Sequence, residues 1–519
     1  MASAYTLFFG TFIQLPRAPS NGKHVLSIHR GALWVSTSDG RIKGIDWSVQ
    51  DEEGLRALMQ RNGWIEHEVN GFSSDPSPST EKVKIVRARE EHNEFFFPGF
   101  IGTSLPQVTN RNTTNRYKDT HIHAPQYPNS GLFGSSTLLD WLETYTFPLE
   151  SSFGDVKQTN TAPAKVHTVY NQVVSRTLAN GTTCASYFAT IHVPATNLLA
   201  SLCYTRGQRA FIGRVCMDNP AFCPNYYRDA SAETSLSATK ASISHIHSID
   251  PDGDVVKPII TPRFAPACSR SSLEDLGKLA ASYSPPLHVQ THISENKSEI
   301  ALVKDVFPDC DSYADVYDRF NLLTPRTILA HGVHLTQSEM NLIRERRSKI
   351  SHCPASNSAL GSGLCPVRSL LDSGITVGLG TDVSGGYSPS ILEQVRQACL
   401  VSRLLKHIPG EEKDGRENLS VEEGLFLATR GGAAVVDMER EIGGFEVGMR
   451  FDAQLIGLGA AKENAGSSGM VDDMGEGTVD VFGWESWTEK IHKWVWCGSD
   501  RNVRGVWVNG RFVHGLTAL

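Results

Sequence analysis

The stretch Asp119-Thr120-His121-Ile122-His123-Ala124-Pro125 has the pattern of a β-strand end that carries two histidines one residue apart. Residues i and i+2 of a strand point to the same side, so both imidazoles would face one point. Two imidazoles directed at one point make half of a metal site. The pattern alone is weak, because the chain also contains His245-Ile246-His247 at the end of a helix-like stretch, which we interpret as structural.

Outward from this strand, seven further β-rich runs alternate with helical stretches. The predicted strands cover residues 186–191, 209–217, 256–264, 287–294, 327–332, 349–353 and 375–381. The helical patterns between them include residues 272–282, 295–305 and 389–405. Such alternation predicts a parallel sheet with crossover helices. Eight strands, counting the one with His121, predict an α/β fold of the (β/α)₈ TIM-barrel type, which takes ~250 residues or more.

Both ends of the chain are β-rich. Asp39-Gly40 separates two strand-like runs near the N-terminus, and Asn509-Gly510 does the same near the C-terminus. Both dipeptides are hairpin signals. Neither end is large enough to form a good sandwich by itself, so we expect one small β-sandwich built from residues 1–96 and 437–519. Residues 97–436 would then form the barrel.

Composition narrows the class of protein. The 519 residues are 40% hydrophobic and 20% charged, with a net charge of -7, which is ordinary for a globular protein. Without a basic block, we expect neither nucleic acid nor an anionic membrane as a partner. Ten scattered cysteines without a C-x-x-C pair predict reduced thiols and a cytoplasmic location. The N-terminal residues lack the basic region of a signal peptide, and no run of 18 apolar residues occurs, so we expect neither a signal peptide nor a membrane span.

Chemically capable side chains lie at five of the predicted strand ends. In a barrel, catalytic groups gather where the strands end. They are His121 and His123 at the first strand, Arg263 and Phe264 at the fourth, His292 and Glu295 at the fifth, His331 at the sixth and Asp382 at the eighth. Any one of them alone would usually be a satisfied core residue. Together, in this order, they predict a mononuclear metal site with spare acid–base groups.

These motifs resemble the amidohydrolase superfamily and, within it, the guanine deaminase family. The matching residues include Asp119-Thr120-His121-Ile122-His123-Ala124 with Gln126-Tyr127, Pro262-Arg263-Phe264, His292-Ile293-Ser294-Glu295-Asn296, Ala330-His331-Gly332, His352-Cys353-Pro354 and Gly378-Leu379-Gly380-Thr381-Asp382-Val383. The resemblance extends from about Phe8 to the C-terminus. It implies hydrolytic deamination of guanine to xanthine and ammonia, by a homodimer. The alternative is a related aminohydrolase acting on a triazine, pterin or adenosine-type ring.

The resemblance also implies roles for individual residues. One Zn²⁺ per chain would be held by His121, His123, His292 and Asp382. The catalytic residues would be Glu295 as proton shuttle, His331 beside the metal water or as a distant ligand, and Asp382. Guanine would be bound by His123, Gln126, Arg263, Phe264, His292 and Asp382. Among these, Arg263 could instead form a structural ion pair, Phe264 could be core, and Gln126 could lie in a surface loop.

Elementary chemistry is consistent with those roles. Zinc lowers the pKa of bound water toward ~7. Glu295, three residues past His292, could protonate a ring nitrogen and then the leaving amine. Arg263 offers fixed donors to a carbonyl oxygen at C6. No lysine ends the fourth strand, where binuclear members of the superfamily carry one, so we expect a single metal; His/Asp ligation would also accept iron.

Residues 102–118 depart from the family pattern. They are a polar, Thr- and Asn-rich insertion of 17 residues between Pro98-Gly99-Phe100-Ile101 and Asp119-Thr120-His121. A polar segment inside a buried strand would leave backbone groups unpaired. We hypothesise that it is a translated intron, which would make the product catalytically impaired. The alternative is a true surface loop after which the strand re-forms.

Overall fold

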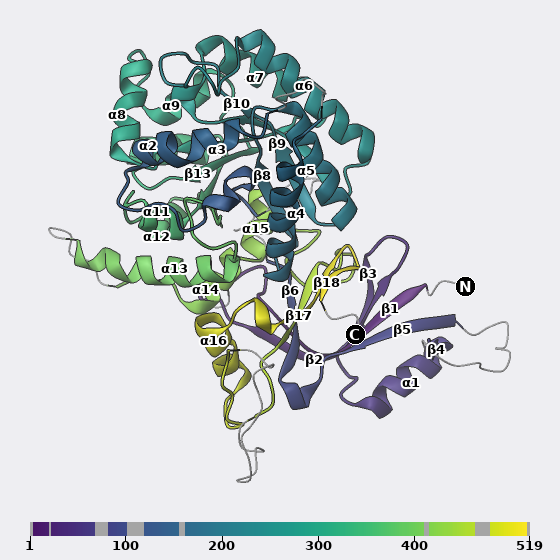
Figure 1. Cartoon of the computed structure of the whole chain (residues 1–519). Helices are drawn as coiled ribbons and strands as arrows, with labels where there is room; N and C mark the ends of the chain where they lie inside the picture. The colour runs from purple at the N-terminus through teal and green to yellow at the C-terminus, as the bar shows by residue number, and fades with distance from the viewer. Residues whose placement is uncertain are drawn as a thin grey trace. The chain divides into compact units, whose positions relative to one another are not determined.

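The computed structural model describes residues 4–19, 22–67, 81–100, 119–154, 161–408, 415–461 and 478–515. The chain divides into two compact units (Figure 1). The first comprises Met1–Gly99, Leu178–Thr183 and Arg440–Leu519, and the second comprises Phe100–Thr177 and Cys184–Glu439. The predicted insertion at residues 102–118 lies outside the described residues.

The second unit is built on eight parallel strands that are neighbours in chain order. They are β7 (Ile122–His123), β8 (Cys184–Phe188), β9 (Arg209–Gly213), β11 (Val256–Pro262), β12 (His288–Ile293), β13 (Thr327–His331), β14 (Lys349–His352) and β15 (Thr376–Leu379). A short strand, β10 (Val215–Cys216), pairs with β11. All eight predicted barrel strands are therefore confirmed, with ends that differ by a few residues.

Backbone hydrogen bonds connect the last strand to the first. The amide of Asp382 donates to the carbonyl of His121 over 2.9 Å, and the amide of His123 donates to the carbonyl of Val383 over 3.1 Å. On its other side, the first strand pairs with β8, where Asp119 exchanges hydrogen bonds with Cys184 and Ser186. The ring of strands is thereby closed, as the predicted barrel requires.

Helices lie between the strands of the second unit and after the last of them. They are α2 (Leu138–Trp141), α3 (Phe147–Ser151), α4 (Ala164–Ala179), α5 (Val193–Arg206), α6 (Ala232–Ile249), α7 (Arg270–Ala281), α8 (Lys297–Val306), α9 (Tyr313–Arg319), α10 (Gln337–Glu345), α11 (Pro354–Ala359), α12 (Val367–Asp372), α13 (Ile391–Leu404), α14 (Val421–Leu427) and α15 (Arg430–Val435). The three helical stretches named from the sequence correspond to α7, α8 and α13. Capping boxes fix several starts; Asn296 and Glu299 form the one before α8. His245 and His247 lie within α6, where we expected a structural role.

Polar side chains form one layer of the barrel interior. Gln290 on β12 donates to the Thr261 hydroxyl over 2.9 Å and accepts from Ser186 on β8. Gly213 on β9 faces the same layer, because a Cβ added there would lie 1.8 Å from Thr261 Oγ1. The interior is therefore filled by side chains and is not a channel.

The first unit contains one mixed sheet made from both ends of the chain. Its order is β18-β17-β16-β6-β1-β2-β3, with β5 beside β1 and β4 beside β5. The strands are β1 (Tyr5–Gln14), β2 (Ser27–Ser36), β3 (Ile42–Asp46), β4 (Trp64–Glu66), β5 (Glu81–Arg87), β6 (Glu94–Pro98), β16 (Ala453–Gly457), β17 (Val503–Val508) and β18 (Arg511–Gly515). Its helices are α1 (Glu52–Asn62) and α16 (Trp487–Cys497). In Figure 1 the purple N-terminal strands and the yellow C-terminal strands share this sheet.

Pairing of β6 with β16 joins the two ends, as the sequence predicted. Both hairpins are confirmed, and Asn509 and Gly510 both have positive φ, as a type I′ turn requires. Buried aromatic side chains, including Phe8, Phe96 and Trp507, form the core beside this sheet. Across the described part of the chain, no helix has the length and apolarity that crossing a membrane requires.

Candidate metal centre and active site

Three histidines and one aspartate meet at the C-terminal ends of the barrel strands. Ligand atoms of His121, His123, His292 and Asp382 all lie within 4.8 Å of one another. Asp382 Oδ1 is 3.1 Å from His121 Nε2 and 3.4 Å from His123 Nε2. His123 Nε2 is 3.1 Å from His292 Nε2. The four predicted metal ligands are thus brought together by β7, β12 and the segment after β15.

The donor set of this cluster fits a divalent cation. Burial lowers the pKa of His121, His123 and His292, which favours the neutral form of the imidazole that binds a metal. Burial would raise the pKa of Asp382, but the histidines around it outweigh that effect and hold its pKa well below the usual range. Neutral imidazole nitrogens and an ionised carboxylate are the ligands that zinc takes in proteins.

Hydrogen bonds outside the cluster orient one of these ligands. His292 Nδ1 lies 2.6 Å from the carbonyl oxygen of Arg263, which can only accept. The Nδ1 atom therefore carries the proton, and the lone pair of Nε2 points into the cluster. In the described residues, His121 Nε2 is buried and has no hydrogen-bond partner outside the cluster, where it faces Asp382 Oδ1, as a nitrogen that binds a metal would.

His331 and Glu295 stand beside the cluster. His331 Nε2 is 3.4 Å from Glu295 Oε2 and 3.8 Å from Asp382 Oδ2. Burial lowers the pKa of His331, but the two carboxylates raise it more, and the net shift is upward. His331 and Asp382 both have positive φ (75° and 44°). A residue held in this left-handed conformation destabilises the fold by of order 1–3 kcal/mol, and such residues are concentrated at functional sites.

Glu295 has the properties of a proton-transfer group. Its carboxyl is buried, and Oε1 accepts a hydrogen bond from the Ser362 hydroxyl over 2.9 Å. Burial raises the pKa of Glu295 to about 7, and the nearby His331 only partly offsets that. A general acid or base works best when its pKa lies near the operating pH.

A cavity opens on these groups. Of the residues predicted from the sequence, it is lined by His123, Gln126, Arg263, Phe264, His292, Glu295 and Asp382. Its other lining residues were not predicted: Leu138, Trp141, Leu142, Glu299 and Leu360. His121, a member of the cluster, and His331, beside it, do not line the cavity. An apolar wall with few polar groups is typical of a small-molecule site.

The alternative interpretations of three residues can now be compared with their surroundings. Arg263 does form a buried ion pair, with Glu150 at 2.7 Å, and it also lines the cavity. Phe264 belongs to an apolar cluster and lines the cavity as well. Gln126 is only 1% exposed, which excludes a surface loop.

Glu150, Asn357 and Ser362 were missed in the sequence. Glu150 accepts from Arg263 and Gln126, Asn357 binds His331, and Ser362 binds Glu295. Of these three residues, only Glu150 could have been noticed in the sequence, as a charged residue directly after the run Phe147-Pro148-Leu149.

Comparisons with known proteins agree with this architecture. The Amidohydrolase family model matches residues 95–513. A probable guanine deaminase of Schizosaccharomyces pombe is 49% identical over 423 residues, covering 82% of this chain and 72% of the relative. A guanine deaminase of Dictyostelium discoideum is 37% identical over 493 residues, covering 94% and 98%. The crystal structure of guanine deaminase from C. acetobutylicum with bound guanine in the active site matches with a TM-score of 0.75 and 29% identity, covering 98% and 100%. The chain therefore belongs to the amidohydrolase family and, within it, to the guanine deaminase family.

Proposed function

We propose that this protein is a zinc-dependent aminohydrolase that converts guanine to xanthine and ammonia. The proposal rests on a cluster of three histidines and one aspartate beside a buried glutamate. This cluster lies at a cavity that Arg263 and Gln126 line. Support comes from the likeness to guanine deaminases, one of which has guanine in its active site.

His121, His123, His292 and Asp382 would hold the zinc. When bound, the metal supplies a Lewis acid that lets water lose its proton near neutral pH. Three nitrogen ligands favour zinc over the hard cations Mg²⁺ and Ca²⁺, which prefer oxygen.

Proton transfer would be the work of Glu295, Asp382 and His331. A purine C2 that carries an amine is a poor electrophile until a ring nitrogen is protonated. With a pKa of about 7, Glu295 can hold that proton, deliver it to the ring and later protonate the leaving amine. Asp382 would accept a proton from the attacking water, and His331 Nε2 would orient these carboxylates.

Arg263, Gln126 and Phe264 would hold the purine. The guanidinium of Arg263 can donate to the carbonyl oxygen at C6, and the carboxamide of Gln126 can both donate and accept along the ring edge. Phe264 would pack against the ring. His123, His292 and Asp382 line the same cavity and would contact the end of the ring that reacts.

We also propose a homodimer in the cytoplasm that serves purine breakdown and binds a small-molecule substrate, but neither nucleic acid nor a membrane. The family resemblance and the absence of a basic block in the sequence support this. Sedimentation of the purified protein measures the first part, and a monomer would contradict it.

Steady-state ammonia release tests the function. We expect a much higher kcat/KM for guanine than for adenosine, a pterin or a triazine. We also expect the protein to contain about one zinc per chain. Glu295→Gln should lower kcat by roughly 10²–10⁴-fold and keep the zinc. Glu274→Gln, the same change at an exposed position of α7, is the control and should change neither. A protein without zinc that releases no ammonia from guanine would contradict the proposal.

A further inference from the structure

We propose that Glu150 is a positioning residue that sets the selectivity for a 6-oxo purine. Glu150 lies in α3 and is fully buried. It does not line the cavity, and so it would act through the residues that do. This inference rests on the proposed function.

The carboxylate of Glu150 gathers donors from three separate parts of the barrel unit. Arg263, after β11, donates from Nη1 to Oε2 over 2.7 Å and from Nη2 to Oε1 over 3.3 Å. Gln126 donates from Nε2 to Oε1 over 2.8 Å. Tyr227 donates from its hydroxyl to Oε2 over 2.6 Å. These four hydrogen bonds match the four lone-pair positions of a carboxylate.

This arrangement fixes which way the carboxamide of Gln126 points. Its Nε2 donates to Glu150, and its Oε1 accepts from the amide of Ser384 over 3.4 Å. A flipped carboxamide would place its oxygen against the carboxylate of Glu150, which cannot donate. One N–H and one lone pair of Gln126 remain for a ligand, in a fixed order along the purine edge.

Glu150 also decides how Arg263 can be used. The guanidinium is 2% exposed and lies over the ring of Phe147 at 5.2 Å. An unpaired buried cation would favour an anionic ligand, because nothing else would balance its charge. Glu150 balances that charge and engages two of the five N–H groups, which leaves three donors in a fixed plane. Such a group suits a neutral carbonyl oxygen, like the one at C6 of guanine.

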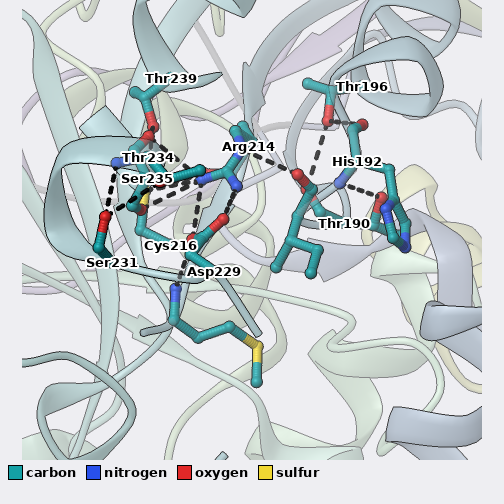
Figure 2. Close-up of polar contacts among 12 residues, drawn as sticks. Thr190, His192, Thr196, Arg214, Cys216, Asp229, Ser231, Thr234, Ser235 and Thr239 are labelled. Atoms are coloured by element: carbon teal, nitrogen blue, oxygen red, sulfur yellow. Dashed lines mark hydrogen bonds and ion pairs between the residues drawn. The ribbon is translucent and has the colours of Figure 1, made fainter. Parts of the chain in front are cut away.

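A second buried ion pair of the same unit provides a matched control. Arg214 donates to Asp229 and to the Ser235 hydroxyl, as Figure 2 shows. Arg214 and Asp229 are as buried as Arg263 and Glu150, but neither lines the cavity. Breaking this pair should cost stability and leave substrate selection alone.

The test compares guanine with 2-aminopurine, which has the same reacting amine but no oxygen at C6. The measured quantity is the ratio of their kcat/KM values, or of their inhibition constants if 2-aminopurine turns over too slowly. Glu150→Gln should lower this ratio by roughly 10–100-fold, mainly through a higher KM for guanine. Tyr227→Phe keeps the charge and should lower it only a few-fold. Asp229→Asn should lower the midpoint of thermal unfolding without changing the ratio.

A double variant keeps the test decisive if Glu150→Gln does not fold. Glu150→Gln combined with Arg263→Gln removes both charges, and its ratio should fall no further than that of Arg263→Gln alone, since both act through one group. The inference would be overturned if the double variant had a lower guanine to 2-aminopurine ratio than Arg263→Gln. It would also be overturned if folded Glu150→Gln kept the wild-type ratio, or if Asp229→Asn lowered the ratio as much as Glu150→Gln does. Wild-type protein that releases no ammonia from guanine would instead refute the proposed function itself.

Discussion

Asn357 accepts a hydrogen bond from His331: its Oδ1 lies 2.9 Å from His331 Nδ1. Because Oδ1 can only accept, Nδ1 of His331 carries the proton. The other ring nitrogen, Nε2, then faces Glu295 Oε2, 3.4 Å away. A histidine beside a metal centre depends on such a partner for its tautomer and its orientation. Asn357 therefore controls the position of His331 without lining the cavity itself.

Replacing Asn357 by Leu should lower kcat about 10–100-fold while KM for guanine and zinc content stay near wild type, because a mispositioned His331 weakens proton transfer and not binding. Steady-state kinetics with metal analysis measures this. Ser356→Ala is the control, since that buried hydroxyl makes no hydrogen bond with any described residue. An equal loss in Ser356→Ala would point to local packing instead.

The buried carboxyl of Glu295 should make stability depend on pH. Its pKa is raised by burial from 4.5 to about 7. Between these values the folded state keeps a proton that the unfolded chain has lost, so stability falls as the pH rises through this window. In metal-free protein, Glu295→Gln should therefore exceed wild type in stability by up to about 3 kcal/mol above pH 7 and by little at pH 5.

Urea unfolding at pH 5, 6, 7 and 8 measures that difference. Glu274→Gln on the surface should show no such trend, because that carboxyl is exposed. A Glu295→Gln variant whose advantage stayed constant with pH would show that Glu295 is not titrating in this range.

Metal removal is expected to abolish activity and to lower stability. The ligands are neutral imidazoles and one carboxylate, so Zn²⁺ should restore ammonia release from guanine and Mg²⁺ should not. Because zinc binds the folded state and not the unfolded chain, it should raise the midpoint of thermal unfolding. That midpoint is a second measurement of metal binding, besides activity. His292→Ala should take up far less zinc, whereas His245→Gln in α6 should take up as much as wild type. Full activity after exhaustive chelation would contradict a metal role.

The sequence predicted the barrel and its cluster because both depend on local patterns. Alternating apolar runs marked the strands, and parallel strands of one barrel must end at the same face. The barrel fold therefore brings residues such as His121 and Asp382 together, although 260 residues of chain separate them. The same reasoning placed Asn509-Gly510 in a hairpin turn, because few residues accept positive φ at both positions.

The network around Glu150 could not be predicted in this way. Glu150 is 24 residues from Gln126 and 113 residues from Arg263, and it belongs to a short helix outside the strand pattern. Nothing periodic links these positions, and a lone glutamate usually faces solvent. Only the folded arrangement reveals that three donors share one carboxylate.

Gly213 should not tolerate a side chain. A Cβ there would lie 1.8 Å from Thr261 Oγ1 and 2.6 Å from Gln290 Nε2, inside the filled barrel. Gly213→Ala is expected to destabilise the fold by about 1–3 kcal/mol through overpacking. Denaturant unfolding measures this, and Gly131→Ala, with nothing near its Cβ but a positive φ, gives a reference for backbone strain alone. Gly213→Ala with wild-type stability would mean that the interior is looser than these distances indicate.

Deletion of residues 102–118 tests whether the insertion affects zinc binding, activity and stability. The hydrogen bonds between Asp119 and β8 show that strand pairing begins at the first described residue after it, and both histidines follow in register. A chain that joins residue 101 to Asp119 is therefore expected to bind about one zinc and to deaminate guanine at least as fast as the full chain. It should also unfold at a higher temperature, because a shorter connection loses less entropy on folding. Replacing residues 102–118 by a Gly/Ser segment of equal length separates the effect of length from that of sequence. A shortened chain that lost zinc would show that the segment supports the site, and mature transcripts that all contain it would exclude the intron hypothesis.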